Sequence, residues 1–318
     1  MSDRPLLAIV GPTASGKTEA AIRLAERFGG EIINADPQQF YRGLDVGTSK
    51  PTPSQQSLVP HHLIDILDPD ERPALRIFQQ QAADALDRIW GRQSLPILVG
   101  GSGQYVWGLL EGWTVPEVPP DEELRRDLQA RADAEGPAAL HAELASVDAE
   151  AASKIEINNV RRVIRALEVY QRTGRPISSC QQRRPLHASV CVVGLALDTA
   201  ELAKRIRIRT ESMFAGGLLE EVKILIARGY SRDLASMRSI GYREAIAVLN
   251  GEMTQYEAIE RTARETRRLA KRQMAWFKRN DPRINWLEHD DYEGMSAVVQ
   301  ASLSLWPRLA HRASKAEA

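Results

Sequence analysis

Short runs of apolar residues alternate in the first third of the chain with longer segments whose apolar side chains recur at helical spacing. Residues 6–10, 31–34 and 95–99 form compact apolar runs typical of buried strands, whereas 18–28 and 78–90 carry the helical pattern. Strands that alternate with helices favour a parallel sheet with helices on both faces. The pattern therefore predicts an α/β core.

An all-helical insert is predicted to interrupt this core. Three prolines lie within 115–121, and 122–172 then shows helical patterns only. A buried-strand pattern returns at 190–197, which indicates that the sheet resumes there. We predict a core formed by residues 1–114 and 187–318 and a helical insert at residues 115–186.

The last third of the chain is predicted to be mainly helical and is rich in basic residues. Helical patterns cover 201–228, 243–250 and 255–279, and the alanine-rich tail after Trp306 is expected to fray. Within 261–279 there are eight basic residues and one acidic residue. These basic side chains could bind the phosphate backbone of a nucleic acid, although a solvated face on a terminal helix explains the cluster nearly as well.

Composition narrows the class of protein. The 318 residues, 43% of them apolar, can form one large domain with an insert. Forty-two basic residues balance 42 acidic ones, so net charge alone does not indicate a nucleic-acid partner. The chain shows two cysteines, no export signal and no apolar run long enough to span a membrane. We therefore expect a soluble, cytoplasmic protein, and a monomer.

A phosphate-binding loop follows the first predicted strand. Residues 11–18 match G-x-x-x-x-G-K-[ST] at every fixed position and lie between a strand and a helix. Backbone N–H groups and the helix N-terminus would cradle an anion, Lys17 would add a full charge, and the Thr18 hydroxyl is suited to hold Mg²⁺. The predicted phosphate-binding residues are Gly11, Pro12, Thr13, Ala14, Ser15, Gly16, Lys17 and Thr18.

The carboxylate that usually accompanies such a loop in NTP hydrolysis is missing from its expected place. The candidate strand, 95–99, runs into Gly100-Gly101-Ser102-Gly103, whereas a carboxylate follows the second strand at Asp36. A bound diphosphate could therefore be a leaving group while Asp36 acts on a nucleophile. Alternatively, Asp36 is a turn residue or a helix N-cap before Pro37.

Six further sequence blocks, in order, resemble the tRNA dimethylallyltransferase (IPP transferase) family, and the likeness runs from about Leu6 to Trp286. They read DPQQFYRGLDVGT at 36–48, PHHLID at 60–65, VGGSGQY at 99–105, RALEV at 165–169, SIGYR at 239–243 and KRQ at 271–273. Three positions depart from the family pattern: Pro37 replaces the usual Ser, Ser102 replaces Thr and Gln104 replaces Leu. Pro37 removes a hydroxyl and an N–H beside Asp36.

The resemblance implies a P-loop NTPase-like fold and a Mg²⁺-dependent prenyl transfer. The N6 amine of the adenosine 3′ to the anticodon (position 37), in tRNAs that read codons beginning with U, would attack dimethylallyl diphosphate and release diphosphate. Asp36 would accept a proton from this poor nucleophile, which helps by about 10²–10⁴-fold. Lys17, Thr13 and Arg209 would stabilise the negative charge that develops on the departing diphosphate. Arg209 could also be one of several solvated arginines on a helix.

The same resemblance implies that the anticodon stem-loop of a tRNA is bound, with one base extruded into a pocket. As bare sequence, the arginines at 161–165 could equally belong to an exposed helix. The residues implied in tRNA binding are Asp36, Pro37, Gln38, Gln39, Ser102, Arg125, Arg161, Arg162, Val163, Ile164, Arg165, Arg238, Ser239, Ile240, Gly241, Tyr242 and Arg243.

Three alternative functions share part of this pattern. A nucleoside or small-molecule kinase would also need the phosphate loop, but it predicts a strand-terminal Asp after 95–99 and no helical insert. A prenyltransferase acting on free adenine nucleotides needs no lobe for a stem-loop. An RNA-binding module with a vestigial phosphate site would leave Asp36 without a role.

Overall fold

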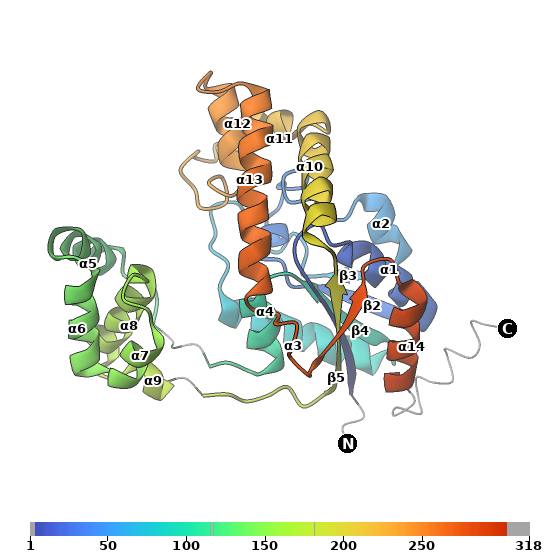
Figure 1. Cartoon of the computed structure of the whole chain (residues 1–318), viewed down its shortest axis with the longest axis horizontal. Helices are drawn as coiled ribbons and strands as arrows, with labels where there is room; N and C mark the ends of the chain where they lie inside the picture. Colours follow the sequence, from blue (N-terminus) through green and yellow to red (C-terminus); the bar gives the residue numbers. More distant parts are fainter. Residues whose placement is uncertain (1–3, 115, 117, 181, 304–318) are drawn as a thin grey trace. The chain divides into compact units, whose positions relative to one another are not determined.

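The computed structural model describes residues 4–114, 116, 118–180 and 182–303. Within these ranges six strands form one sheet in which every pairing is parallel, in the order β3-β2-β4-β1-β5-β6 (Figure 1). The predicted parallel α/β sheet is therefore confirmed. The strands are β1 (Pro5–Val10), β2 (Gly30–Asn34), β3 (His61–His62), β4 (Leu95–Gly100), β5 (Ser189–Ala196) and β6 (Ile284–Glu288).

None of the helices in the described part of the chain is long and apolar enough to cross a membrane. The helices of the sheet-containing part include those predicted within 18–28, 78–90, 201–228, 243–250 and 255–279, together with others that the sequence did not predict. They are α1 (Lys17–Phe28), η1 (Pro37–Phe40, a 3₁₀ helix), α2 (Pro53–Leu58), α3 (Leu75–Gly91), α4 (Gly103–Leu110), α10 (Thr199–Ala215), α11 (Leu218–Ala227), α12 (Tyr242–Leu249), α13 (Gln255–Met274) and α14 (Tyr292–Leu303).

The C-terminal part differs from the sequence prediction in several places, and α14 is a helix that the sequence did not predict. The helix predicted over 255–279 ends at Met274, because the chain turns to bury Phe277, whose ring packs against Trp107. The edge strand β6 was not predicted, since its side chains are mostly half-exposed or exposed and give no apolar run. The tail after Trp306 lies outside the described residues.

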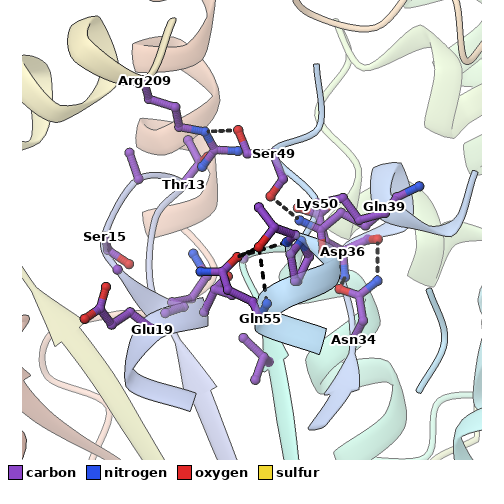
Figure 2. Close-up of a pocket in the computed structure, with 18 of the residues that line it drawn as sticks. Thr13, Ser15, Glu19, Asn34, Asp36, Gln39, Ser49, Lys50, Gln55 and Arg209 are labelled. Carbon is purple, nitrogen blue, oxygen red and sulfur yellow. Dashed lines mark hydrogen bonds between the residues drawn. The ribbon is translucent and has the colours of Figure 1, made fainter. Parts of the chain in front are cut away.

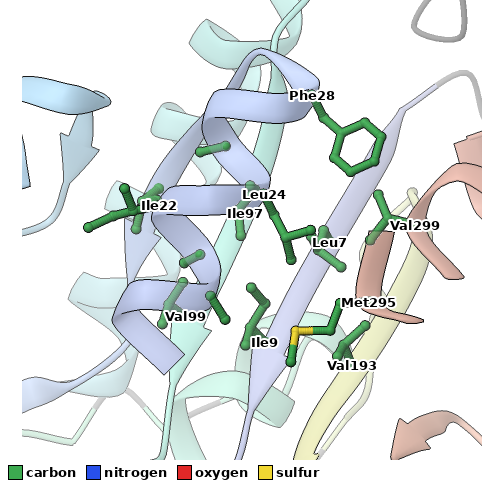
Figure 3. Packing of buried hydrophobic residues seen from close by; sticks show 14 of the residues in the cluster. Leu7, Ile9, Ile22, Leu24, Phe28, Ile97, Val99, Val193, Met295 and Val299 are labelled. Carbon is green, nitrogen blue, oxygen red and sulfur yellow. The ribbon is translucent and has the colours of Figure 1, made fainter. Parts of the chain in front are cut away.

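Apolar side chains cover both faces of the sheet. On one face, Leu7 and Ile9 of β1 join Leu24 of α1 and Met295 of α14 in a buried cluster (Figure 3). Leu6, which alternates with them along β1 and so points to the other face, is buried as well. The strands therefore form a rigid base for the loops at their carboxyl ends.

Glycines allow three of these loops to lie close together. Val10 of β1 pairs with Gly100 of β4, so the loop after β1 begins beside the end of β4. A methyl group on Gly100 would lie 2.9 Å from the Ala35 carbonyl oxygen, and one on Gly101 would lie 3.1 Å from the Gly11 carbonyl oxygen. Side chains at these positions would push apart the loops that follow β1, β2 and β4.

The chain divides into two compact units, the second formed by Glu111–Leu186. This unit begins four residues before the predicted insert, whose first residue, Val115, lies outside the described residues. Its core contains Leu128, Leu144 and Val163. The helices are α5 (Glu122–Glu135), α6 (Pro137–Val147), α7 (Ala149–Lys154), α8 (Val160–Thr173) and α9 (Ile177–Cys180).

Candidate active site

A cavity of about 960 Å³ opens at the carboxyl edge of the sheet. Side chains from separate segments reach it, with Thr13 and Arg209 on one side and Asp36 on the other (Figure 2). Its volume is that of a typical ligand site. The lining includes Thr13, Ala14, Ser15, Gly16, Lys17, Thr18, Asn34, Asp36, Gln39, Asp45, Val46, Ser49, Lys50, Asp65, Gly100, Gly101, Arg205, Arg209, Met213 and Gln273.

The predicted phosphate loop contributes one wall of the cavity. Gly16, with φ +89°, caps the N-terminus of α1, a backbone conformation that favours glycine. The ammonium of Lys17 donates to the Pro12 carbonyl oxygen at 2.6 Å, which folds the side chain back over the loop. Burial lowers the pKa of Lys17 to about 7, an effect that Asp36 opposes and Arg209 reinforces. A bound anion would favour the charged ammonium.

Arg209 connects the phosphate loop to a second loop. From α10, its Nη1 donates to Thr13 Oγ1 at 3.2 Å and its Nε donates to Ser49 Oγ at 2.8 Å. Nη2 donates to the Thr48 carbonyl oxygen at 3.1 Å. Burial lowers the pKa of this guanidinium, while Asp36 raises it. The residue therefore lies inside the cavity wall, and the alternative of a solvated arginine is wrong.

Asp36 both caps a helix and faces the cavity. Its Oδ1 accepts the backbone N–H of Gln38 at 3.0 Å, so the N-cap role considered as an alternative is present in η1. Asn34 fixes the same turn: its Oδ1 accepts the Asp36 N–H at 3.0 Å. The carboxylate acts electrostatically on both Lys17 and Arg209. Capping and catalysis are compatible, because Oδ2 has no hydrogen-bond partner among the described residues.

The loop after η1 supplies residues that the sequence did not indicate as site residues. Ser49, which accepts from Arg209, has φ +48°, an uncommon conformation for a residue other than glycine. Gln39 of η1, which was predicted to bind tRNA, donates its side-chain amide to the Ser49 carbonyl oxygen at 3.2 Å. Lys50 is buried and forms ion pairs with Asp45 and Asp65. Only the neighbouring DVGT block pointed to this loop.

Two distant residues hold these loops in place. Glu221 of α11 accepts the backbone N–H groups of Asp45 and Val46, at 2.9 and 2.7 Å, and the hydroxyl of Tyr242 at 2.6 Å. Gln273 of α13 accepts the Thr13 N–H at 2.8 Å. Gln273 belongs to the KRQ block, from which the sequence alone predicts no role for the glutamine.

The residues predicted to contact tRNA in the sheet-containing unit differ in accessibility. Arg238 is exposed and pairs with Asp233, and Arg243 pairs with Glu244. Tyr242 is fully buried, and its hydroxyl donates to Glu221, the residue that holds the loop at Asp45–Val46. Its ring therefore does not lie at the surface. Ser102 precedes α4 and is half-buried. The tRNA contacts of this group remain predictions.

The predicted tRNA residues of the helical unit divide in the same way. Arg161 and Arg162 at the start of α8 are exposed, whereas Val163 and Ile164 lie in the hydrophobic core of the helical unit. Arg125 and Arg165 both donate to the buried carboxylate of Glu168, at 2.8 and 2.5 Å. These two arginines have a structural partner already, and their contact with RNA remains a prediction.

Metal binding would depend on the Thr18 hydroxyl together with the ligand. No cluster of three or more His, Cys, Asp or Glu side chains able to hold a metal occurs among the described residues. Mg²⁺ commonly binds through one or two protein oxygens, substrate phosphates and waters. Thr18, which lines the cavity beside Lys17, fits that mode of binding.

Two family models match the chain. The model described as IPP transferase matches residues 39–280, and the one described as Isopentenyl transferase matches residues 5–62. Together they span strands β1 to β5, the cavity loops and the helical unit, whereas β6 lies beyond the matched residues. Both the phosphate loop and Asp36 lie inside the matched residues.

Curated proteins and solved structures resemble most of the chain. The tRNA dimethylallyltransferase of Roseiflexus sp. (strain RS-1) is 50% identical over 275 residues, 86% of this chain and 90% of that protein. The one from Thermomicrobium roseum is 44% identical over 303 residues, 94% of this chain and 92% of that protein.

The similar structures include the tRNA isopentenylpyrophosphate transferase from Bacillus halodurans, at 38% identity and a TM-score of 0.68, covering 99% of this chain and 100% of that one. A eukaryotic dimethylallyltransferase acting on tRNA matches at 26% identity and a TM-score of 0.79, covering 95% of this chain and 79% of that one. Sequence and fold therefore point to the same group of proteins.

Proposed function

Because the chain belongs to the IPP transferase family and is a tRNA prenyltransferase, we propose a specific reaction for its cavity. Dimethylallyl diphosphate binds in the phosphate loop, and its prenyl group moves to the N6 amine of the adenosine 3′ to the anticodon, position 37, in tRNAs that read codons beginning with U. Diphosphate leaves. The new bond joins N6 to C1 of the dimethylallyl group, and the bond from C1 to the bridging oxygen breaks.

Asp36 acts as the general base in this proposal. The lone pair of an adenine amine is delocalised into the ring, so loss of a proton as the new bond forms assists attack. Oδ1 is engaged with the Gln38 N–H, and Oδ2 is left to accept the proton. Asn34 fixes the backbone of this turn, which orients the carboxylate without neutralising it.

Thr13, Lys17 and Arg209 stabilise the departing diphosphate. Arg209 Nη1 donates to Thr13 Oγ1, so the hydroxyl proton of Thr13 is free to point elsewhere, toward the oxygen that gains charge. Lys17 lies at the N-terminus of α1, where the helix dipole also favours an anion. A magnesium ion held by Thr18 and the phosphate oxygens would neutralise further charge on the diphosphate.

One observation supports a transferase cavity over a kinase cavity. Asp36 follows β2 and lines the cavity with the phosphate loop, whereas β4 ends in Gly100 and continues to Gly101. The other carboxylates of the cavity wall have basic partners: Glu19 pairs with Arg23, and Asp45 and Asp65 pair with Lys50. A kinase would require a carboxylate that holds magnesium on the phosphate side of the site. Asp36 is better suited to deprotonate an incoming nucleophile.

Label transfer tests this function. The protein is incubated with unmodified tRNA, labelled dimethylallyl diphosphate and Mg²⁺, and label in the RNA is measured. Asp36→Asn should lower the rate of transfer by about 10²–10⁴-fold, because the base is lost, while tRNA binding is retained. Transfer at the unchanged rate would remove Asp36 from the mechanism, and consumption of ATP without transfer would support the kinase.

A further inference from the structure

Arg205 lies one helical turn before Arg209 on α10 and lines the same cavity. Two of its nitrogens are held by the protein: Nε donates to Glu201 Oε1 at 2.9 Å, and Nη2 donates to Nε2 of His289. The third nitrogen, Nη1, forms no hydrogen bond with any residue that the structure describes. The guanidinium is therefore held in place while part of its donor capacity is left unused.

The unused nitrogen lies beside the phosphate loop. A methyl group placed on Gly16 would be 3.8 Å from Arg205 Nη1. Gly16 caps α1, and the free N–H groups at this helix end attract anions. Arg209 contacts the loop at its other end, through Thr13. The two arginines therefore lie at opposite ends of one phosphate loop.

Three basic side chains line the cavity at this wall, and the nearby Glu19 pairs with Arg23. Lys17, Arg205 and Arg209 all lie there, together with the positive end of the α1 dipole. Glu201 offsets part of the charge of Arg205, but it lies on the same helix and binds Nε only. Cations held this close repel one another, and an anion with several charges removes that repulsion.

We propose that Arg205 is a second diphosphate-binding arginine and that His289 is its positioning residue. Arg205 binds the phosphoryl group nearest the N-terminus of α1, and Arg209 binds near Thr13. His289 accepts from Arg205 Nη2 through an unprotonated Nε2, which keeps Nη1 aimed at Gly16. The inference rests on the proposed function only in taking the bound anion to be a diphosphate.

Arg207 offers a matched control on the same helix. It lies two residues from Arg205, but its guanidinium pairs with Glu211 and Glu260, and it does not line the cavity. Arg205→Ala and Arg207→Ala each remove one positive charge from α10. A general electrostatic effect would weaken anion binding to a similar degree in both variants, whereas direct contact would affect Arg205→Ala alone.

Binding of inorganic diphosphate with Mg²⁺, followed by calorimetry in the absence of tRNA, is the test. Arg205→Ala should weaken binding roughly ten- to hundredfold, as expected for a lost charge-assisted contact, and Arg207→Ala should stay within about twofold of the wild type. Arg205→Lys should lie between them, because it keeps the charge but not the fork of donors. Equal affinities of the two alanine variants would overturn the proposal.

Two further measurements cover misfolding and separate this proposal from the proposed function. If Arg205→Ala unfolds, His289→Ala takes its place and should weaken diphosphate binding several-fold; unchanged affinity would overturn the positioning role. In steady-state transfer, Arg205→Lys should raise the KM for the prenyl donor and leave the KM for tRNA unchanged. A wild-type protein that binds diphosphate but transfers no prenyl group contradicts the proposed function alone.

Discussion

Arginines in the helical unit and in the cavity are buried to a similar degree but have opposite kinds of partner. In the helical unit, Arg125 and Arg165 share the fully buried carboxylate of Glu168. In the cavity, the partners of Arg209 among the described residues are uncharged oxygens, on Thr13, Thr48 and Ser49. The first arrangement pairs guanidinium groups with a counter-charge inside the protein, whereas the second holds a cation in place through uncharged partners.

This difference separates stabilising arginines from ligand-binding ones better than sequence position does. Arg165 begins a sequence block that resembles the family, whereas Arg125 and Arg209 lie outside the six blocks, yet all three arginines were predicted to contact a substrate. A cation that contacts only neutral groups can attract an incoming anion without first giving up a charged partner. A cation paired with a buried carboxylate must break that pair first. We therefore expect substitutions in the two regions to affect different measurements.

The largest expected effect is on the helical unit. Glu168→Gln removes the buried carboxylate that two half-buried guanidinium groups share, and removing one partner of a buried pair costs about 3–5 kcal/mol. Amide hydrogen exchange in α5 and α8 should therefore quicken strongly. The affinity for diphosphate should not change, because the cavity lies in the other unit.

An exposed pair in the same unit serves as the control for this substitution. Glu150 forms an i,i+4 pair with Lys154, and both side chains are more than 60% exposed. Glu150→Gln should change the free energy of opening by less than about 0.5 kcal/mol. Similar exchange rates in the two variants, or loss of diphosphate binding in Glu168→Gln, would break the contrast between the regions.

A smaller effect is expected from the anchor of the second cavity loop. Glu221→Gln replaces one carboxylate oxygen by an NH₂ group, which faces donors at Asp45, Val46 or Tyr242. Loss of these contacts should cost about 1–3 kcal/mol. The loop that carries Ser49 then loosens, Arg209 loses its support, and the KM for the prenyl donor rises.

Glu220, the residue before Glu221, provides the control for this substitution. Glu220 lies on the same helix, is 66% exposed and pairs only with Lys223 among the described residues. Glu220→Gln should leave both the melting temperature and the donor KM close to the wild-type values. If Glu221→Gln behaves like Glu220→Gln in both measurements, Glu221 does not organise the cavity.

Local signals in the sequence accounted for the parts of the site that are local in the chain. The phosphate loop lies within eight consecutive residues between a strand and a helix, and Asp36 follows the next strand directly. Parallel strands end at one sheet edge, so their proximity followed from the predicted fold. The fold class was accessible for the same reason, since buried strands and amphipathic helices have distinct periodicities.

The partners that hold the site were not accessible in this way. Glu221 acts on backbone groups about 175 positions before it, and Gln273 acts on Thr13 across 260 positions. Periodicity indicates which side of a helix is buried but not which loop it meets. Lys50 reads as a surface residue and is buried only because Asp45 and Asp65 neutralise it.

The smallest expected effect comes from Gln273, an uncharged residue that contacts the phosphate loop, and it tests whether charge or loop geometry dominates anion binding. Gln273 accepts the Thr13 N–H without adding charge to the cavity. Gln273→Ala removes one hydrogen bond, worth about 0.5–1.5 kcal/mol, so diphosphate affinity should fall roughly two- to tenfold by calorimetry. Gln255→Ala, at the exposed start of the same helix, should have no effect. A loss in Gln273→Ala as large as that caused by removing Arg209 would mean that loop geometry, and not cationic charge, dominates binding.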